Sequence, residues 1–215
     1  MGKHSGGYEN ITFDITDALC DGENRLTVAV TDKTDQSPHA YGKQRYDRGG
    51  IWYTAQSGIW QTVWMESVPE NYIRGIKLDP ALDSVVITID GEGPFTVEFD
   101  GKLYRPKTNR FRLRPENPRL WTPDDPHLYT VVVRNCDDAV ESYFALRTIS
   151  AEKVGKYHRL LLNGKPYFFH GLLDQGYWPD GLFLPGSPEG YTWDIQTMKS
   201  LGFNTIRKHI KIEPE

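Results

Sequence analysis

Several features that would point directly to a function are scarce or missing in this sequence. It holds only two cysteines among 215 residues, Cys20 and Cys136, and their separation fits neither a metal motif nor a redox pair. We therefore expect both thiols to be free and buried. The net charge is only −4 and the basic residues are scattered, which argues against a nucleic-acid partner.

Long apolar runs are also absent. No stretch approaches the ~20 apolar residues that a membrane-spanning helix needs, and no signal peptide opens the chain, so we expect no membrane partner. The histidines share no ligand spacing and the paired glycines lack the strand–helix setting of a phosphate loop, so we expect neither a metal nor another cofactor. The sequence leaves open the compartment and whether the chain forms a homo-oligomer.

Aromatic bulk is what the sequence does contain, concentrated in one stretch. Residues 49–66 hold three of the six tryptophans, Trp52, Trp60 and Trp64. After a Ser-Gly turn signal, residues 59–66 alternate with a period of two and are rich in β-branched and aromatic side chains. We therefore predict a strand there, with both faces at least partly covered and the tryptophans mostly in a core. Pro69 should end it.

The remainder of residues 1–70 also indicates β structure. Residues 11–15 and 26–30 alternate, and turn signals lie between them, so we expect a strand at each place. Residues 32–48 are polar and lack periodicity, which predicts a long loop.

Residues 71–150 predict a complete β unit. Short strands are expected over residues 73–78, 85–90, 95–99, 102–105, 110–114, 129–134 and 142–149. Asp100-Gly101 is a strong signal for a two-residue hairpin turn. About seven strands in about 80 residues is typical of an immunoglobulin-like sandwich.

The pattern changes after residue 150, where strands and one helix are expected. Apolar strands are predicted over residues 158–162, 166–173 and 203–206, with Asn163-Gly164 as a hairpin turn. A helix should run from Trp193 to Leu201, with Thr192 as its N-cap and Gly202 at the C′ position. A strand, a helix and a second strand form a βαβ unit, whose strands pair in parallel.

Several motifs, taken in order, resemble one enzyme family. They are SGIWQTVWME, LWTPDDPHLYTVVV, LLLNGKPYFFHGLLDQGYW and MKSLGFNTIRKHIKIEP. Together they resemble glycoside hydrolase family 2, the β-galactosidases, β-glucuronidases and β-mannosidases, over nearly the whole chain. In that family a jelly-roll sugar-binding domain precedes an immunoglobulin-like sandwich and a (β/α)8 catalytic barrel.

The resemblance implies a mainly β chain with parts of three domains. Residues 1–70 would be the C-terminal part of the jelly roll, because three or four strands fall short of the roughly eight that it needs. Residues 71–150 would be the whole immunoglobulin-like sandwich. Residues 151–215 would supply only the first βαβ unit of the barrel, which takes ~250 residues.

The resemblance also implies a retaining, exo-acting β-glycosidase that hydrolyses O-glycosidic bonds in carbohydrates. Such an enzyme needs one carboxylate as acid/base and another as nucleophile. The family places its acid/base in an Asn-Glu pair, and this sequence contains no Asn-Glu dipeptide. The glutamates after residue 150 match neither catalytic position of the family; they are Glu152, Glu189, Glu213 and Glu215. We therefore expect no catalytic residue in this chain.

Substrate-side residues are still expected, because barrel active sites gather at the carboxyl ends of the strands. The first such strand ends near Asp174, Gln175 and Trp178, and the second ends at Arg207 and His209. In the family an arginine followed shortly by a histidine contacts the sugar, which implies that role for Arg207 and His209. Many β-galactosidases separate the two by two residues and carry Arg-His where this chain has Asp174-Gln175.

Structural roles compete with each of these assignments. Arg207 can pair with a core carboxylate, His209 can face solvent beside two lysines, and Trp178 can anchor a loop. For the whole chain, the alternative to an enzyme segment is a non-catalytic β-sandwich module that binds carbohydrate or protein. The βαβ pattern favours the enzyme segment, because a free-standing module has no use for it.

The first prediction concerns activity. We expect the 215-residue chain to be inert on aryl β-glycosides, because neither step of the double displacement proceeds without a nucleophile and an acid/base. The measurement is release of p-nitrophenol from a panel of p-nitrophenyl glycosides. Turnover well above a buffer blank, with contaminating hydrolases excluded, would contradict this expectation.

Overall fold

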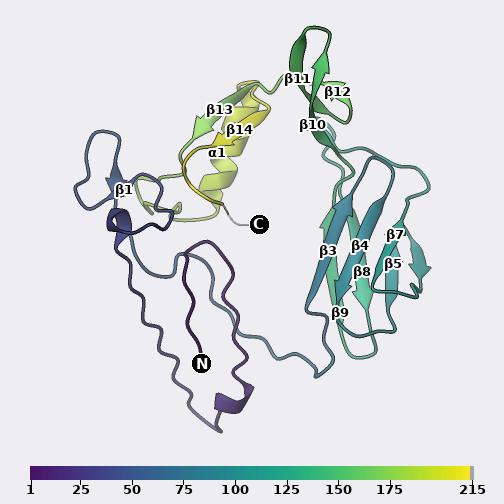
Figure 1. Cartoon of the computed structure of the whole chain (residues 1–215), viewed down its shortest axis with the longest axis horizontal. Coiled ribbons are helices and arrows are strands. Elements are labelled where there is room, and N and C mark those ends of the chain that lie inside the picture. Colours follow the sequence, from purple (N-terminus) through teal and green to yellow (C-terminus); the bar gives the residue numbers. More distant parts are fainter. Residues whose placement is uncertain (214–215) are drawn as a thin grey trace. The chain divides into compact units, whose positions relative to one another are not determined.

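Strand pairing and packing divide the chain into two units. The computed structural model describes residues 1–213, which are mainly β and contain a single α-helix (Figure 1). Residues 65–169 form one unit, here called the sandwich unit. Residues 1–64 and the residues from 170 onward form the other, here called the helix-containing unit.

Two antiparallel sheets form the core of the sandwich unit (Figure 1). The first has the order β3-β4-β7 and consists of Gly75–Pro80, Val85–Asp90 and Arg110–Leu113. The second has the order β6-β5-β8-β9 and consists of Lys102–Tyr104, Thr96–Phe99, Tyr129–Arg134 and Ala139–Phe144. These strands confirm the β unit predicted for this region, and those at 85–90 and 129–134 have the predicted bounds.

Alternating burial explains why these two sheets hold together. In β4 every second residue is buried, beginning with Val85, and in β8 the buried side chains include Val131 and Val133. Aromatic rings of the second sheet join the same core cluster as β4, and Phe99 lies 5.7 Å from Phe144 between ring centroids. Each fully buried side chain of this size contributes ~1.5–3 kcal/mol relative to an exposed one, so this core stabilises the unit.

Both predicted hairpin turns are present. Asp100 and Gly101 connect β5 to β6 with φ angles of 51° and 68°. Asn163 and Gly164 adopt φ angles of 54° and 73° in the same kind of turn. Positive φ at both central positions defines a type I′ turn, which Asn-Gly and Asp-Gly favour.

Two predicted strands are each divided in the structure. The strand expected over residues 142–149 is interrupted after β9, because Leu146 leaves the sheet and forms an isolated bridge with Leu120. The strand expected over residues 166–173 is also split. A small antiparallel sheet then has the order β10-β11-β12, with the bounds Ile149–Val154, Tyr157–Leu162 and Lys165–Pro166.

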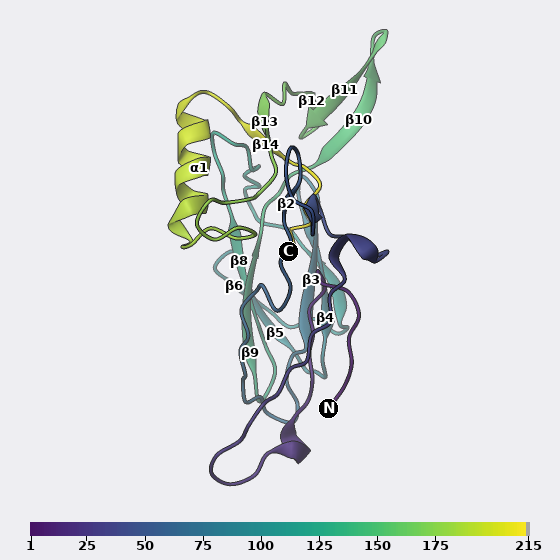
Figure 2. The ribbon, with the colours of Figure 1, turned by 90° about the vertical axis from the view of Figure 1, so that its left-hand side faces the viewer.

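The helix-containing unit has one parallel pair beside the α-helix. Strands β13 (Gly171–Asp174) and β14 (Thr205–Lys208) pair in parallel, and α1 (Glu189–Ser200) connects them. The helix lies beside this pair in both views (Figure 1, Figure 2). The predicted βαβ order with parallel pairing is therefore confirmed.

The N-terminal part of this unit contains only short elements. Its 3-10 helices and two parallel strands are Thr16–Ala18, Thr34–Gln36, β1 (Gln44–Arg45) and β2 (Tyr53–Thr54). Among residues 1–213, no helix has the length and apolar character needed to cross a bilayer.

The helix begins earlier than predicted. Pro188 occupies the N-cap with no side-chain cap bond, and Thr192 lies inside the helix rather than at its start. Proline suits this end because its fixed φ is helical and its missing N–H has no intrahelical partner there. The other end is as predicted: Gly202 has a φ of 88°, and the N–H groups of Gly202 and Phe203 donate to Lys199 and Met198. These two bonds form a Schellman motif.

Other predictions were wrong. Residues 11–15, 26–30 and 59–66 form no strand, and Trp64 is 69% exposed rather than in a core. Their alternating pattern is real, but a strand also needs a neighbouring strand for its backbone groups, and among residues 1–213 these segments pair with none. The two thiols are likewise exposed, not buried, since both lie in polar loops. The jelly roll stays a prediction.

The sandwich core generates the second prediction. Leu146 is fully buried, so Leu146→Ala should lower the free energy of unfolding by about 2–5 kcal/mol, from lost transfer energy and a residual cavity. Leu160→Ala is the matched control in the same unit, because Leu160 is 51% exposed and should change stability by less than ~0.5 kcal/mol. Urea titration compares the two. Equal effects would contradict the assignment of this core.

Candidate substrate-binding site

The carboxyl ends of β13 and β14 lie at one edge of the parallel pair. Asp174 and Lys208 are register partners at the last position of the two strands. One residue further, the backbone N–H of His209 donates to the carbonyl oxygen of Asp174 at 2.8 Å. Parallel pairing therefore brings together the two chain segments that carry the predicted site residues.

Arg207 and His209 lie side by side on one face of this edge. They are two residues apart in an extended chain, so their side chains project to the same side. The Arg207 Nη1 donates to His209 Nδ1 at 3.2 Å. Because a guanidinium can only donate, the imidazole accepts at Nδ1 and carries its proton on Nε2. Among residues 1–213, no carboxylate lies within ion-pair distance of Arg207.

Lys208 projects to the opposite face, toward α1. Its Nζ lies 2.5 Å from Asp174 Oδ2 and 3.0 Å from Glu213 Oε1, and the Lys208, Asp174 and Glu213 side chains are 26%, 27% and 35% exposed. Burial alone would lower the pKa of Lys208, but the hydrogen bonds to the two carboxylates raise it above its usual range. This cluster ties the ends of the two strands together.

A pocket of about 240 Å³ lies between the parallel pair and the helix. Its lining combines the charged cluster with apolar and aromatic side chains, namely Asp174, Trp178, Tyr191, Asp194, Ile195, Met198, Ile206, Lys208 and Glu213. Trp178 reaches α1 edge-on, with its ring 5.5 Å from that of Tyr191. A side chain at Gly190 would come within 3.2 Å of the Trp178 ring, so glycine allows this packing.

Two of the predicted site residues carry buried polar atoms without a hydrogen bond. Among residues 1–213, the Gln175 Oε1 and Trp178 Nε1 have no partner. Buried polar atoms in folded proteins are nearly always satisfied, so such atoms indicate a place where a further polar group binds. Both atoms belong to the loop that follows β13.

The five predicted residues thus separate into three sets. Arg207 and His209 share one face, whereas the side chain of Asp174 lies on the helix side. There the Asp174 carboxylate accepts from Gly176 N at 2.7 Å and from Lys208. Gln175 and Trp178 belong to the connecting loop. The sequence showed which residues end the strands, but their division between the two faces follows from the register.

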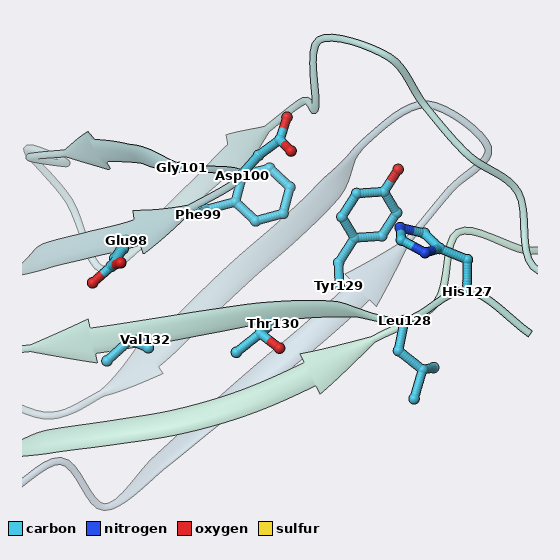
Figure 3. Close-up of a pocket in the computed structure, with 9 residues that line it drawn as sticks. All are labelled: Glu98, Phe99, Asp100, Gly101, His127, Leu128, Tyr129, Thr130 and Val132. Carbon is cyan, nitrogen blue, oxygen red and sulfur yellow. The ribbon is translucent and has the colours of Figure 1, made fainter.

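A second pocket, of about 320 Å³, lies on the sandwich unit (Figure 3). Strands β5 and β8 and the turns beside them line it, and the His127 ring lies 4.5 Å from that of Tyr129. The pocket contains none of the residues predicted for substrate binding. It also lacks the orphaned polar atoms found beside β13.

The sandwich unit supplies the deciding comparison. Residues 74–147 match the family model described as glycosyl hydrolases family 2. The sandwich unit of this chain is therefore similar to that of family 2 glycosyl hydrolases. The match covers the two sheets of the sandwich, which confirms the resemblance found in the sequence motifs.

Similar proteins extend the family 2 comparison beyond the sandwich. A β-galactosidase of Thermoanaerobacter pseudethanolicus is 24% identical over 96% of this chain and 31% of its own length. A β-glucuronidase of Felis catus is 26% identical over 96% of this chain and 37% of its own length. This chain therefore spans about a third of the length of these relatives.

Solved structures support the fold. The β-glucuronidase of Faecalibacterium prausnitzii aligns with 65% of this chain and 24% of its own, with a TM-score of 0.53 and 23% identity. A β-glucuronidase from Ruminococcus gnavus gives a TM-score of 0.53 at 19% identity, over 65% of this chain and 26% of its own. At this level of identity the likeness shows the arrangement of the elements alone.

The sequence missed most of the charged residues beside the site. Lys208 and Glu213 pair on the helix side and Lys211 contacts Glu213, yet of this group and its partner Asp174 only Asp174 was predicted as a site residue. A signal was present, because strict alternation after Ile206 places Lys208 on the opposite face from its neighbours. The burial of Lys211, by contrast, depends on a loop conformation that no pattern reveals.

The third prediction separates a structural Asp174 from a sugar-binding one. Asp174→Asn should lower the local stability of the parallel pair by ~1–3 kcal/mol, because Lys208 loses one charged partner while the Asn Oδ1 still accepts from Gly176. Amide hydrogen exchange of β13 and β14 measures this. Asp79→Asn is the matched control, since Asp79 pairs with Lys77 on the exposed surface. Unchanged exchange in Asp174→Asn would contradict the structural role.

Proposed function

We propose that this chain is a segment of a retaining, exo-acting β-glycosidase that hydrolyses O-glycosidic bonds in carbohydrates. The match of residues 74–147 to the family 2 model supports a hydrolase as the parent protein. Residues 1–70 would be the C-terminal part of a jelly-roll sugar-binding domain. Residues 71–150 would be the immunoglobulin-like sandwich, and residues 151–215 the start of a (β/α)8 barrel.

In this proposal the catalytic carboxylates lie outside the chain and the chain contributes to substrate binding. Arg207 would grip adjacent sugar hydroxyls or orient a catalytic carboxylate, because its fork presents five donors in a fixed geometry. His209 would offer the Nε2–H to the same region, since its Nδ1 is occupied by Arg207. Gln175 and Trp178 would complete the set from the neighbouring loop.

One observation carries the proposal. The Arg207–His209 pair projects from the carboxyl edge of a parallel pair, on the face opposite to α1. In a (β/α)8 barrel the helices cover the outside, so the face away from the helix is the interior, and active sites gather at the carboxyl edge. The orphaned Gln175 Oε1 at that edge adds support, because a hydroxyl group of a sugar would satisfy it, whereas Trp178 lines the pocket on the helix side.

The names of the relatives do not identify one sugar as the substrate. Two relatives are named for different sugars, one as a β-galactosidase and one as a β-glucuronidase. An uncharged galactoside and an anionic glucuronide place different demands on a site. Arg207 and His209 together can bind an uncharged galactoside or an anionic glucuronide. The proposal therefore names the reaction and leaves the sugar unassigned.

The fourth prediction tests Arg207 in the intact parent enzyme. Arg207→Lys keeps the positive charge but loses the planar guanidinium group with its five donors. The value of kcat/KM should therefore fall by more than about tenfold, which corresponds to on the order of 1.4 kcal/mol of transition-state binding. The melting temperature should change little, because Arg207 is exposed. Arg112→Lys is the matched control on an exposed site of the sandwich and should keep normal kinetics. A variant that unfolds while its folded fraction turns over normally would show that Arg207 is structural.

A further inference from the structure

A fully enclosed lysine lies beside the candidate site. The side chain of Lys211 is 0% exposed. Its ammonium donates to the carbonyl oxygens of Gly176 at 3.0 Å and Phe183 at 2.5 Å, and it lies 3.4 Å from Glu213 Oε1. Lysine is almost never buried unless it is paired, so these three partners account for its position.

Two aromatic rings pack around the Lys211 ammonium group. The Lys211 Nζ lies 4.4 Å from the ring centroid of Phe183 and 6.0 Å from that of Trp60. Trp60 also packs edge-on against Phe183, with 4.9 Å between ring centroids. Burial lowers the pKa of Lys211, and Glu213 only partly offsets that effect. Lys211 thus joins the N-terminal segment, the loop after β13 and the segment after β14.

The backbone around Lys211 is shaped to admit it. Gly176 has a φ of 66°, and a side chain there would come within 3.0 Å of Lys211 Cδ and 2.8 Å of Lys208 Nζ. Only glycine leaves this space open while adopting that conformation without strain. The close approach lets the Gly176 carbonyl oxygen reach the ammonium.

Ile210 adopts a strained backbone conformation in this arrangement. Its φ of 64° lies in the left-handed region, which β-branched residues rarely adopt. Such conformations persist where the surrounding structure over-determines them. Ile210 lies between His209 and Lys211, and the chain turns at this residue. The His209 side chain therefore points to Arg207, and the Lys211 side chain points into the loop that encloses it. The contacts of Lys211 on one side, and the bond from the His209 N–H to the Asp174 carbonyl oxygen on the other, hold this turn.

We propose that Lys211 is a positioning residue whose buried ammonium fixes the loop of residues 175–183 to the segment after β14. In doing so it holds His209 beside Arg207 and orients Gln175 and Trp178 at the same edge. The inference rests on the proposed function, in which these residues bind the substrate. Lys211 itself does not touch substrate, because its donors are occupied and its side chain is enclosed.

The fifth prediction tests this role in the 215-residue chain. Lys211→Met keeps the length of the side chain but removes the donors, so amide exchange over residues 175–183 should become at least about tenfold faster, while β8 is unchanged. The ¹⁵N signal of His209 Nδ1 should also shift, because the neutral ring loses its fixed Nε2–H tautomer. Lys199→Met is the matched control, since Lys199 is an exposed lysine in the last turn of α1.

A measurement without substitution covers the case in which Lys211→Met fails to fold. Limited acetylation of the unmodified chain should label Lys211 at least about tenfold more slowly than Lys199, because the enclosed amine reacts only on local opening. Equal labelling would overturn the inference. So would a folded Lys211→Met chain with normal exchange and an unchanged His209 signal.

Kinetics of the intact parent enzyme then separate this inference from the proposed function. If both hold, Lys211→Met should lower kcat/KM by about tenfold or more through misplaced substrate contacts, although Lys211 touches no substrate. Altered exchange and an altered His209 signal with normal kinetics would uphold the positioning of the loop and overturn the substrate-binding role of Arg207 and His209.

Discussion

A β-strand exists only where its backbone groups find a partner, and this requirement governs the whole structure. In the sandwich unit every predicted run has a neighbour to pair with, and the alternating side chains then meet in one core. In the N-terminal segment the same alternation occurs over residues 11–15, 26–30 and 59–66, yet the chain forms no ladder there. Local sequence pattern sets the tendency to form a strand, and non-local pairing decides whether the strand is present.

The same distinction explains which parts of the fold could be predicted. Turns depend on the conformation of two residues, so Asp100-Gly101 and Asn163-Gly164 were predictable from residue type alone. The helix end at Gly202 was predictable for the same reason, whereas its start at Glu189 was not, since Pro188 replaces a side-chain cap. Burial requires knowledge of neighbours, which is why the exposure of the two thiols was missed.

Within the candidate site, the residues that end the strands could be predicted, but their grouping could not. Parallel register sends Lys208 toward the helix and its two neighbours away from it. One short segment therefore carries both a binding face and the charged cluster behind it. The two roles are linked through the backbone, because Arg207 and Lys208 are consecutive residues of β14.

The turn at Asn163 has a consequence for the chemical lifetime of the protein. Its side-chain amide donates to the carbonyl oxygen of Trp121 at 3.0 Å, and its Oδ1 accepts from the backbone N–H of Thr148 at 3.0 Å. An asparagine before glycine is the dipeptide most prone to spontaneous deamidation, because the glycine nitrogen can attack the side-chain amide. Aspartate at this position would keep the acceptor but lose the donor, and a negative oxygen would then face the Trp121 carbonyl. Deamidation of Asn163 would therefore weaken the attachment of the β10-β11-β12 sheet to the loop that contains Trp121.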